Sequence, residues 1–212
     1  SGEWFESLNP YTAQPWALVP RGSKEDIDRA VAAAKAAFYS PAWKGLTATA
    51  RGHLLRKFAD LATAEADRIA LIESTDNGKL YAEMRAQLNY IPQWFHYYGG
   101  LADKIEDRVI PIDKLGVFNF TRVEPLGVVA AITPWNSPLL LATWKLAPLL
   151  AAGCTVVWKP SEFSSVSAFA FGELFERAGF PPGVVNIVTG FGNEVGEPLL
   201  THPDIAKVAF TG

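Results

Sequence analysis

The spacing of apolar residues in the first hundred positions predicts a series of helices. Between Lys24 and Phe38, apolar side chains recur at helical spacing, at Ile27, Val31, Ala34 and Phe38. Ser23 and Asp26 have the spacing of a capping box at the start of this helix. The same kind of pattern predicts a second helix around residues 54–62, a third that ends at "DNG" (76–78), and a fourth over residues 81–98.

The pattern changes to a period of two after these helices. Within residues 109–126, a short apolar run is followed by a turn at residues 114–116 and then by alternation through Val117, Asn119, Thr121 and Val123. Such alternation indicates a strand with two different faces, so this segment is predicted to be a β-hairpin. Because an isolated two-stranded hairpin is only marginally stable in water, we expect it to lean on another domain or another subunit.

Beyond Gly127, patterns typical of buried strands alternate with helical ones. Strands are predicted to begin near residues 128, 155, 184 and 208, and helices to cover residues 138–152 and 165–179. This alternation indicates parallel strands joined by right-handed crossovers. The predicted fold class is α/β, a Rossmann-like parallel sheet with flanking helices and a protruding hairpin. Because the last strand ends at "FTG" (210–212) with no helix after it, we expect this sheet to be incomplete.

Composition narrows the classes of protein. The 212 residues are 49% hydrophobic and carry a net charge of −3, which suits a sizeable core and argues against both disorder and nucleic-acid binding. No apolar run is long enough to span a membrane. Cys154 is the only cysteine, so we expect neither a disulfide within the chain nor a cysteine metal site. We also expect a cytoplasmic location. The three histidines, His53, His96 and His202, show no metal-ligand spacing.

Asn136 lies in the first stretch that could carry chemistry. The unbroken apolar run 128–132 predicts a strand covered on both faces, and Pro134 and Pro138 follow it. Since proline fits the first turn of a helix but not a central strand, the stretch predicts strand, tight turn and helix. Ligands of open parallel sheets bind at such turns. The Asn136 amide is therefore either a helix N-cap or a hydrogen-bond donor to an oxyanion in the crevice.

Two further stretches follow predicted strands. In "KPSE", Lys159 and Glu162 could hold the hydroxyls of a nucleotide ribose, or the stretch could simply start a helix with Ser161 as its cap. In "TGFGNEVG", Gly190, Gly192 and Gly196 are one residue too widely spaced for the dinucleotide-binding fingerprint. A tight strand-to-helix turn explains these glycines equally well.

Lys145 and Cys154 are the remaining candidates. Lys145 is the only charge within a long apolar helix. Its side chain can extend to the surface. If it is held inside, it must find a partner carboxylate or lose its charge. Cys154 opens an apolar strand with no His or Arg nearby in the sequence to activate its thiol. We therefore interpret Cys154 as a structural residue.

Three segments, "TPWNSPLLLATWKLAPLLAAGCTVVWKPSE", "GFPPGVVNIVTGFG" and "DIAKVAFTG", together closely resemble the aldehyde dehydrogenase superfamily. The resemblance runs from about Asn9 to the last residue. It implies oxidation of an aldehyde to a carboxylic acid with NAD or NADP as the cofactor. The reaction in this superfamily passes through a thiohemiacetal and a thioester on a catalytic cysteine.

The resemblance also implies roles for particular residues. Asn136 matches the oxyanion-hole amide, and Lys145 matches a lysine of a proton relay. The positions that match the cofactor site fall into four groups: Thr133, Pro134 and Trp135 along the nicotinamide ribose; Lys159, Pro160, Ser161 and Glu162 at the adenosine ribose; Gly192 against the adenine; and Gly212 under the pyrophosphate.

The chain departs from the superfamily at its end. The catalytic cysteine and the general-base glutamate both belong to sequence that would follow "FTG", and Cys154 matches neither. The chain therefore looks like the N-terminal part of an aldehyde dehydrogenase, with residues 1–108 and 127–212 in the cofactor domain and a 109–126 hairpin for homo-oligomerisation. Alone, it is predicted to be inactive. The alternatives are a non-catalytic nucleotide-binding or interaction module, and an acylating relative that uses coenzyme A.

Overall fold

The computed structural model describes residues 2–212, and a parallel sheet forms the centre of this region. Its four strands lie in the spatial order β5-β4-β3-β6. The strands are β3 (Val128–Ile132), β4 (Thr155–Lys159), β5 (Val185–Ile187) and β6 (Ile205–Phe210). The chain moves outward from β3 to β4 and β5 and then returns to the other side of β3. This reversal places a topological switch point between β3 and β6, where open α/β sheets bind their ligands.

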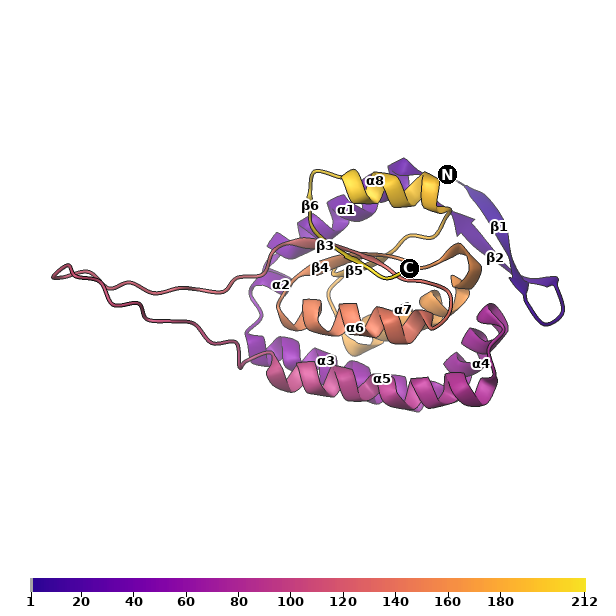
Figure 1. Ribbon diagram of the computed structural model, residues 1–212, viewed down its shortest axis with the longest axis horizontal. Coiled ribbons are helices and arrows are strands. Elements are labelled where there is room, and N and C mark those ends of the chain that lie inside the picture. The colour runs from indigo at the N-terminus through magenta and orange to yellow at the C-terminus, as the bar shows by residue number, and fades with distance from the viewer. Residues whose placement is uncertain (1) are drawn as a thin grey trace.

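Helices cover both faces of the sheet (Figure 1). On one face lie α1 (Lys24–Tyr39) and α8 (Glu197–Thr201), and on the other lie α6 (Pro138–Ala151) and α7 (Val166–Ala178). A further layer of α3 (Ala48–Ala64), α4 (Ala66–Asn77) and α5 (Tyr81–Leu101) covers α6 and α7. The short helices are α2 (Pro41–Lys44), the 3₁₀ turn η1 (Glu162–Ser164) and the π-helical turn η2 (Gly192–Gly196).

Alternating residues of β3 supply two separate cores, because successive side chains of a strand point to opposite faces. Val128 and Ala130 join a cluster with α1, whereas Val129 and Ala131 join the larger cluster that includes residues of α6 and α7. Aromatic rings fill the larger core, where Phe58 of α3 stacks on Phe175 of α7 with a centroid distance of 4.1 Å. The unbroken apolar run of β3 is therefore explained by burial on both sides.

The α/β fold and the expected helices are confirmed. The capping box of Ser23 and Asp26 starts α1, and Gly78 ends α4 in the left-handed conformation with a φ of 75°. The last strand begins at Ile205, earlier than the expected start near residue 208. The sequence patterns also missed an antiparallel hairpin of β1 (Glu3–Asn9) and β2 (Gln14–Arg21), which lies beside the end of the sheet (Figure 1).

The expected hairpin at residues 109–126 is only partly correct. The segment protrudes as a long arm and turns back at the expected place, where Gly116 has a φ of 78° (Figure 1). However, its two limbs do not form regular strands, and within residues 2–212 their antiparallel pairing is one isolated bridge between Val109 and Phe120. A two-stranded ribbon without a third strand or a covered face lacks the contacts that stabilise regular pairing. Within the described part of the chain, no helix is long and apolar enough to cross a membrane.

Candidate functional site

A cavity of about 1040 Å³ opens at the switch point of the sheet. It is formed by the segments that follow β3, β4 and β6 together with η2 and α8. It contains nearly all the residues that the sequence placed at a cofactor site, namely Thr133, Pro134, Trp135, Lys159, Ser161, Glu162, Gly192 and Gly212, as well as Asn136. Its lining also includes Phe163, Asn193 and Thr211, which the sequence analysis did not select.

The turn after β3 is held by hydrogen bonds with the neighbouring strand β4. The Thr133 N–H donates to the Lys159 carbonyl at 3.2 Å, and the indole N–H of Trp158 donates to the Thr133 hydroxyl at 2.9 Å. Thr133 is thus buried, whereas Trp135 and Asn136 are exposed at the cavity. Ser137, and not Asn136, occupies the N-cap position of α6, so the helix-cap interpretation of Asn136 is wrong. The Asn136 carboxamide is instead part of the cavity wall.

The N-terminus of α6 is held by side chains from other helices. Pro138 has no N–H, and the next backbone N–H, that of Leu139, donates to the Glu73 carboxylate of α4 at 3.2 Å. The Gln87 amide of α5 donates to the Ser137 hydroxyl at 3.2 Å. Burial raises the pKa of Glu73 to about 8. The sequence analysis missed Glu73, although it continues the apolar stripe of α4 that includes Ile69 and Ala70.

Lys159 and Glu162 form an ion pair on another wall of the cavity. The Lys159 ammonium is buried and donates to the Glu162 carboxylate at 3.2 Å and to the Pro160 carbonyl at 3.1 Å. Pro160 itself is buried and does not line the cavity. The Ser161 hydroxyl accepts from the Phe163 N–H at 3.3 Å, so it caps η1. Both interpretations of "KPSE" are therefore compatible, because the cap orients the turn that presents the carboxylate.

The glycine-rich turn also lines the cavity, through Gly192 and Gly196. A Cβ at Gly192 or Gly196 would meet no atom within 4 Å, so a side chain there would project into open space. The turn is anchored by β2, because Arg21 donates to the Glu194 carboxylate at 2.9 Å and lies over the Phe191 ring. The N-terminal hairpin therefore helps to shape the cavity. No local pattern in the sequence indicates this contact, since the two segments lie far apart along the chain.

Lys145 reaches the edge of the sheet near the cavity. Its ammonium is half-buried, and it donates a hydrogen bond to the hydroxyl of Thr211, which follows β6 and lines the cavity. Burial lowers the pKa of Lys145. Of the two outcomes expected for this lysine, the side chain is partly held inside, with a hydroxyl as the partner that the structure records.

Comparisons with known proteins show the family to which the chain belongs. The family model described as "Aldehyde dehydrogenase family" matches residues 1–212. The chain belongs to the aldehyde dehydrogenase family. Among curated relatives, it is 50% identical over 208 residues to an Acinetobacter baylyi (Z)-2-((N-methylformamido)methylene)-5-hydroxybutyrolactone dehydrogenase, covering 98% of this chain and 43% of that protein. It is 46% identical to human retinaldehyde dehydrogenase 3, covering 100% of this chain and 42% of that protein.

Solved aldehyde dehydrogenases have the same fold. The NAD⁺ complex of a Bacillus cereus aldehyde dehydrogenase aligns with a TM-score of 0.96 and 44% identity, over 100% of this chain and 43% of that chain. A betaine aldehyde dehydrogenase from Staphylococcus aureus in complex with NAD⁺ aligns with a TM-score of 0.95 and 40% identity, over 99% of this chain and 42% of that chain. The present chain thus spans less than half the length of these family members.

Cys154 lies far from Asn136 in this aldehyde dehydrogenase chain. It directly precedes β4 and is buried, whereas Asn136 follows the carboxyl end of β3. The two strands run parallel with Val128 opposite Thr155, so the two residues lie at opposite ends of the strands, roughly 15 Å apart or more along them. The fold does bring Arg51 close to Cys154, but the guanidinium donates to the Ala151 and Leu46 carbonyls. This environment agrees with a structural cysteine.

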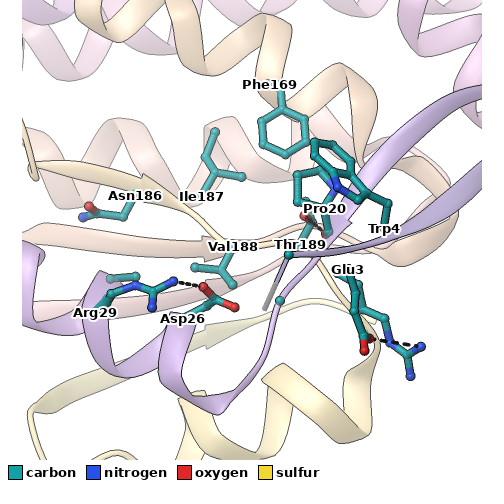
Figure 2. Close-up of a pocket in the computed structure, with 14 residues that line it drawn as sticks. Glu3, Trp4, Pro20, Asp26, Arg29, Phe169, Asn186, Ile187, Val188 and Thr189 are labelled. Carbon is teal, nitrogen blue, oxygen red and sulfur yellow. Dashed lines mark hydrogen bonds and ion pairs between the residues drawn. The ribbon is translucent and has the colours of Figure 1, made fainter.

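A second cavity, of about 500 Å³, lies between the N-terminal hairpin, α1 and β5 (Figure 2). Figure 2 shows Asp26 and Arg29 pointing toward one another at its edge, where they form an ion pair. The Asn186 amide donates to the carbonyls of Val156 and Gly183. These polar groups already have protein partners, so this cavity offers little to a reacting molecule. Among residues 2–212, no cluster of His, Cys, Asp and Glu side chains could hold a metal ion.

Proposed function

We propose that this chain supplies the NAD-binding part and the oxyanion donor of an NAD-dependent aldehyde dehydrogenase. The observation that carries the proposal is the convergence of Asn136, Lys159 and Glu162 on one cavity at the switch point of the sheet. These three residues come from the ends of two adjacent parallel strands. In the family to which the chain belongs, solved relatives contain NAD⁺.

The cavity suits a dinucleotide. Its volume of about 1040 Å³ lies just above the range of about 300–1000 Å³ that is usual for ligand and cofactor sites. The Glu162 carboxylate can accept hydrogen bonds from a ribose diol, and the Lys159 ammonium can donate to the same hydroxyls. Bound NAD would accept a hydride from the substrate. Gly192 and Gly196 leave room for a planar ring beside η2, since neither fills the space with a side chain.

Asn136 would stabilise the oxygen of the aldehyde as it acquires negative charge. A carboxamide N–H is a preorganised donor, and donors of this kind act most strongly where water is excluded. Lys145, in the middle of α6, would move a proton, because a half-buried lysine with a lowered pKa loses its proton more readily. The Thr211 hydroxyl, which accepts from Lys145, would connect that ammonium with the cavity.

The nucleophile would come from a part of the protein outside residues 1–212. Cys154 is buried at the wrong end of its strand, and the chain spans 43% of the length of its Acinetobacter relative. We therefore propose that the chain is the N-terminal part of the enzyme and is inactive alone. A cytosolic location stays a prediction from the cysteine content. The chain covers less than half of its relatives, so a second candidate function is that of a binding module, which keeps the nucleotide site without the chemistry.

Turnover of Asn136→Ala in the full-length enzyme tests the proposal. We expect turnover to fall by about 10²–10³-fold while NAD affinity changes little, because the lost donor acts on the developing charge. Asn136→Asp should lose at least as much, since a carboxylate repels an oxyanion. Asn89→Ala, an exposed asparagine on α5, serves as the control. Normal turnover in both Asn136 variants would refute the proposed role.

The arm at residues 109–126 is proposed to join copies of the chain. Its large apolar side chains are exposed, with Leu115 fully exposed and Phe118 exposed by 70%. A free strand-like segment with such side chains invites pairing with another chain. Phe118→Asp should therefore shift the full-length protein toward smaller species in light scattering coupled to size-exclusion chromatography. Asp113→Asn, at the tip of the same arm, is the control, and an unchanged mass in Phe118→Asp would exclude this surface.

A further inference from the structure

The N-terminus of α6 has no local cap, although it directly follows the proposed oxyanion donor. The Ser137 hydroxyl at the N-cap position donates to the Asn136 carbonyl at 2.7 Å instead of accepting a bond from the first turn of the helix. Pro138 removes one N–H from that turn. The Leu139 N–H is therefore the first backbone donor of α6, and it needs an acceptor from outside the helix.

Two side chains from the outer helix layer hold this terminus. Glu73 of α4 accepts from the Leu139 N–H, and Gln87 of α5 donates to the Ser137 hydroxyl. Ser137 in turn binds the carbonyl of Asn136. The Gln87 bond therefore leads through Ser137 to the backbone of Asn136, and the Glu73 bond holds the Leu139 N–H three residues further along the same segment. Rotation of the turn would break at least one of them.

Asp76 provides a comparison one helical turn along α4. It is also buried, but both of its oxygens are used, by the Ser7 hydroxyl and by the N–H groups of Val166 and Ser167 at the start of α7. Glu73 uses only Oε1 in this way. Among residues 2–212, its buried Oε2 has no hydrogen-bond partner, and neither has the buried Oε1 of Gln87.

A buried carboxyl group with one unpartnered oxygen is costly for the fold, so its presence needs another reason. A leucine at this position would fill a similar volume and would avoid the cost of a buried polar atom. Such a leucine could not accept from Leu139. The requirement that Glu73 meets is therefore the acceptor at the α6 terminus.

We propose that Glu73 is a positioning residue that fixes the orientation of Asn136 through the N-terminus of α6, with Gln87 as its partner. This inference rests on the proposed role of Asn136. Glu73 does not line the cavity, so it acts only through the turn. The chemistry of an acceptor is what matters, and a neutral amide at this position can supply it.

The experiment compares full-length enzymes with Glu73→Leu, Glu73→Gln, Asn136→Ala and the double change Glu73→Leu with Asn136→Ala. Glu73→Leu should lower kcat by roughly tenfold or more with the KM for NAD changed by less than about twofold, because a small misplacement of a catalytic group costs rate. Glu73→Gln should recover most of kcat. The double variant should be no slower than Asn136→Ala alone, since residues that act as one unit are not additive.

Other outcomes separate the two ideas. If Asn136→Ala has normal turnover, the proposed function fails whatever Glu73 does. If Asn136→Ala is slow but Glu73→Leu is not, or if the two losses multiply, the positioning role is overturned. Should Glu73→Leu fail to fold, Gln87→Leu replaces it in the same cycle, because it removes the other support of the turn. Asp76→Asn is the matched control and should lower the melting temperature while leaving kcat within about twofold of wild type.

Discussion

Replacing Glu73 by glutamine should change how the stability of the protein depends on pH. Burial raises the pKa of Glu73 from 4.5 to about 8; the hydrogen bond from Leu139 opposes this rise, Asp76 adds to it and Lys79 reduces it. The folded protein therefore keeps a proton on Glu73 between about pH 4.5 and about pH 8, where the unfolded chain has lost it. Stability falls with rising pH wherever the folded state binds more protons. Glu73 thus makes the wild type less stable as the pH rises through this window, and a glutamine does not.

The size of the effect follows from the same pKa. Each pKa unit corresponds to about 1.4 kcal/mol. A rise from 4.5 to about 8 therefore means that Glu73 lowers the free energy of unfolding at alkaline pH by at most about 5 kcal/mol. Side chains and water relax around a buried charge, as effective protein dielectric constants of about 20 indicate. We therefore expect Glu73→Gln to gain about 2–3 kcal/mol relative to wild type between about pH 5 and about pH 9.

The assay is urea unfolding of full-length wild type and Glu73→Gln at about pH 5, pH 7 and pH 9, followed by far-UV circular dichroism. Glu106→Gln, the same substitution at an exposed glutamate at the base of the arm, is the control. A stability difference that is equal at all three pH values would refute the reasoning. A difference that shrinks as the pH rises would mean that the folded protein prefers the Glu73 carboxylate, stabilised at the α6 terminus.

Two further predictions concern the cofactor and the chemistry. In the full-length enzyme, Glu162→Gln should narrow the preference for NAD over NADP, because the Glu162 carboxylate accepts the ribose hydroxyls and repels a 2′-phosphate; the ratio of kcat/KM values measures this, and an unchanged ratio would remove Glu162 from the ribose site. A purified chain of residues 1–212 should give no aldehyde-dependent NADH absorbance, because it lacks a thiolate near Asn136. NADH production that survives Cys154→Ser would show that the chemistry needs no further cysteine, whereas production abolished by that change would make Cys154 the nucleophile.

The sequence alone determined most elements of the fold, because their signals are local. The capping residues Ser23 and Asp26 and the stop at Gly78 act within one turn of their helices. The apolar run of β3 identified a buried strand before its neighbours were known. Much of the candidate site was determined in the same way. Asn136 follows β3 and Lys159 ends β4, and parallel strands bring their carboxyl ends to one edge, so the two residues meet without further information.

Only the tertiary structure decided the contacts between distant segments. The strand order β5-β4-β3-β6 places the switch point beside Asn136, and no local pattern encodes that order. The arm shows the alternation of a strand, but regular pairing requires neighbours that the described chain does not provide. Glu73 resembles any helical glutamate until α4 packs against the start of α6. Burial and the loss of water then convert an ordinary carboxyl group into a helix cap with a raised pKa, because desolvation depends on what surrounds a residue in space and not along the chain.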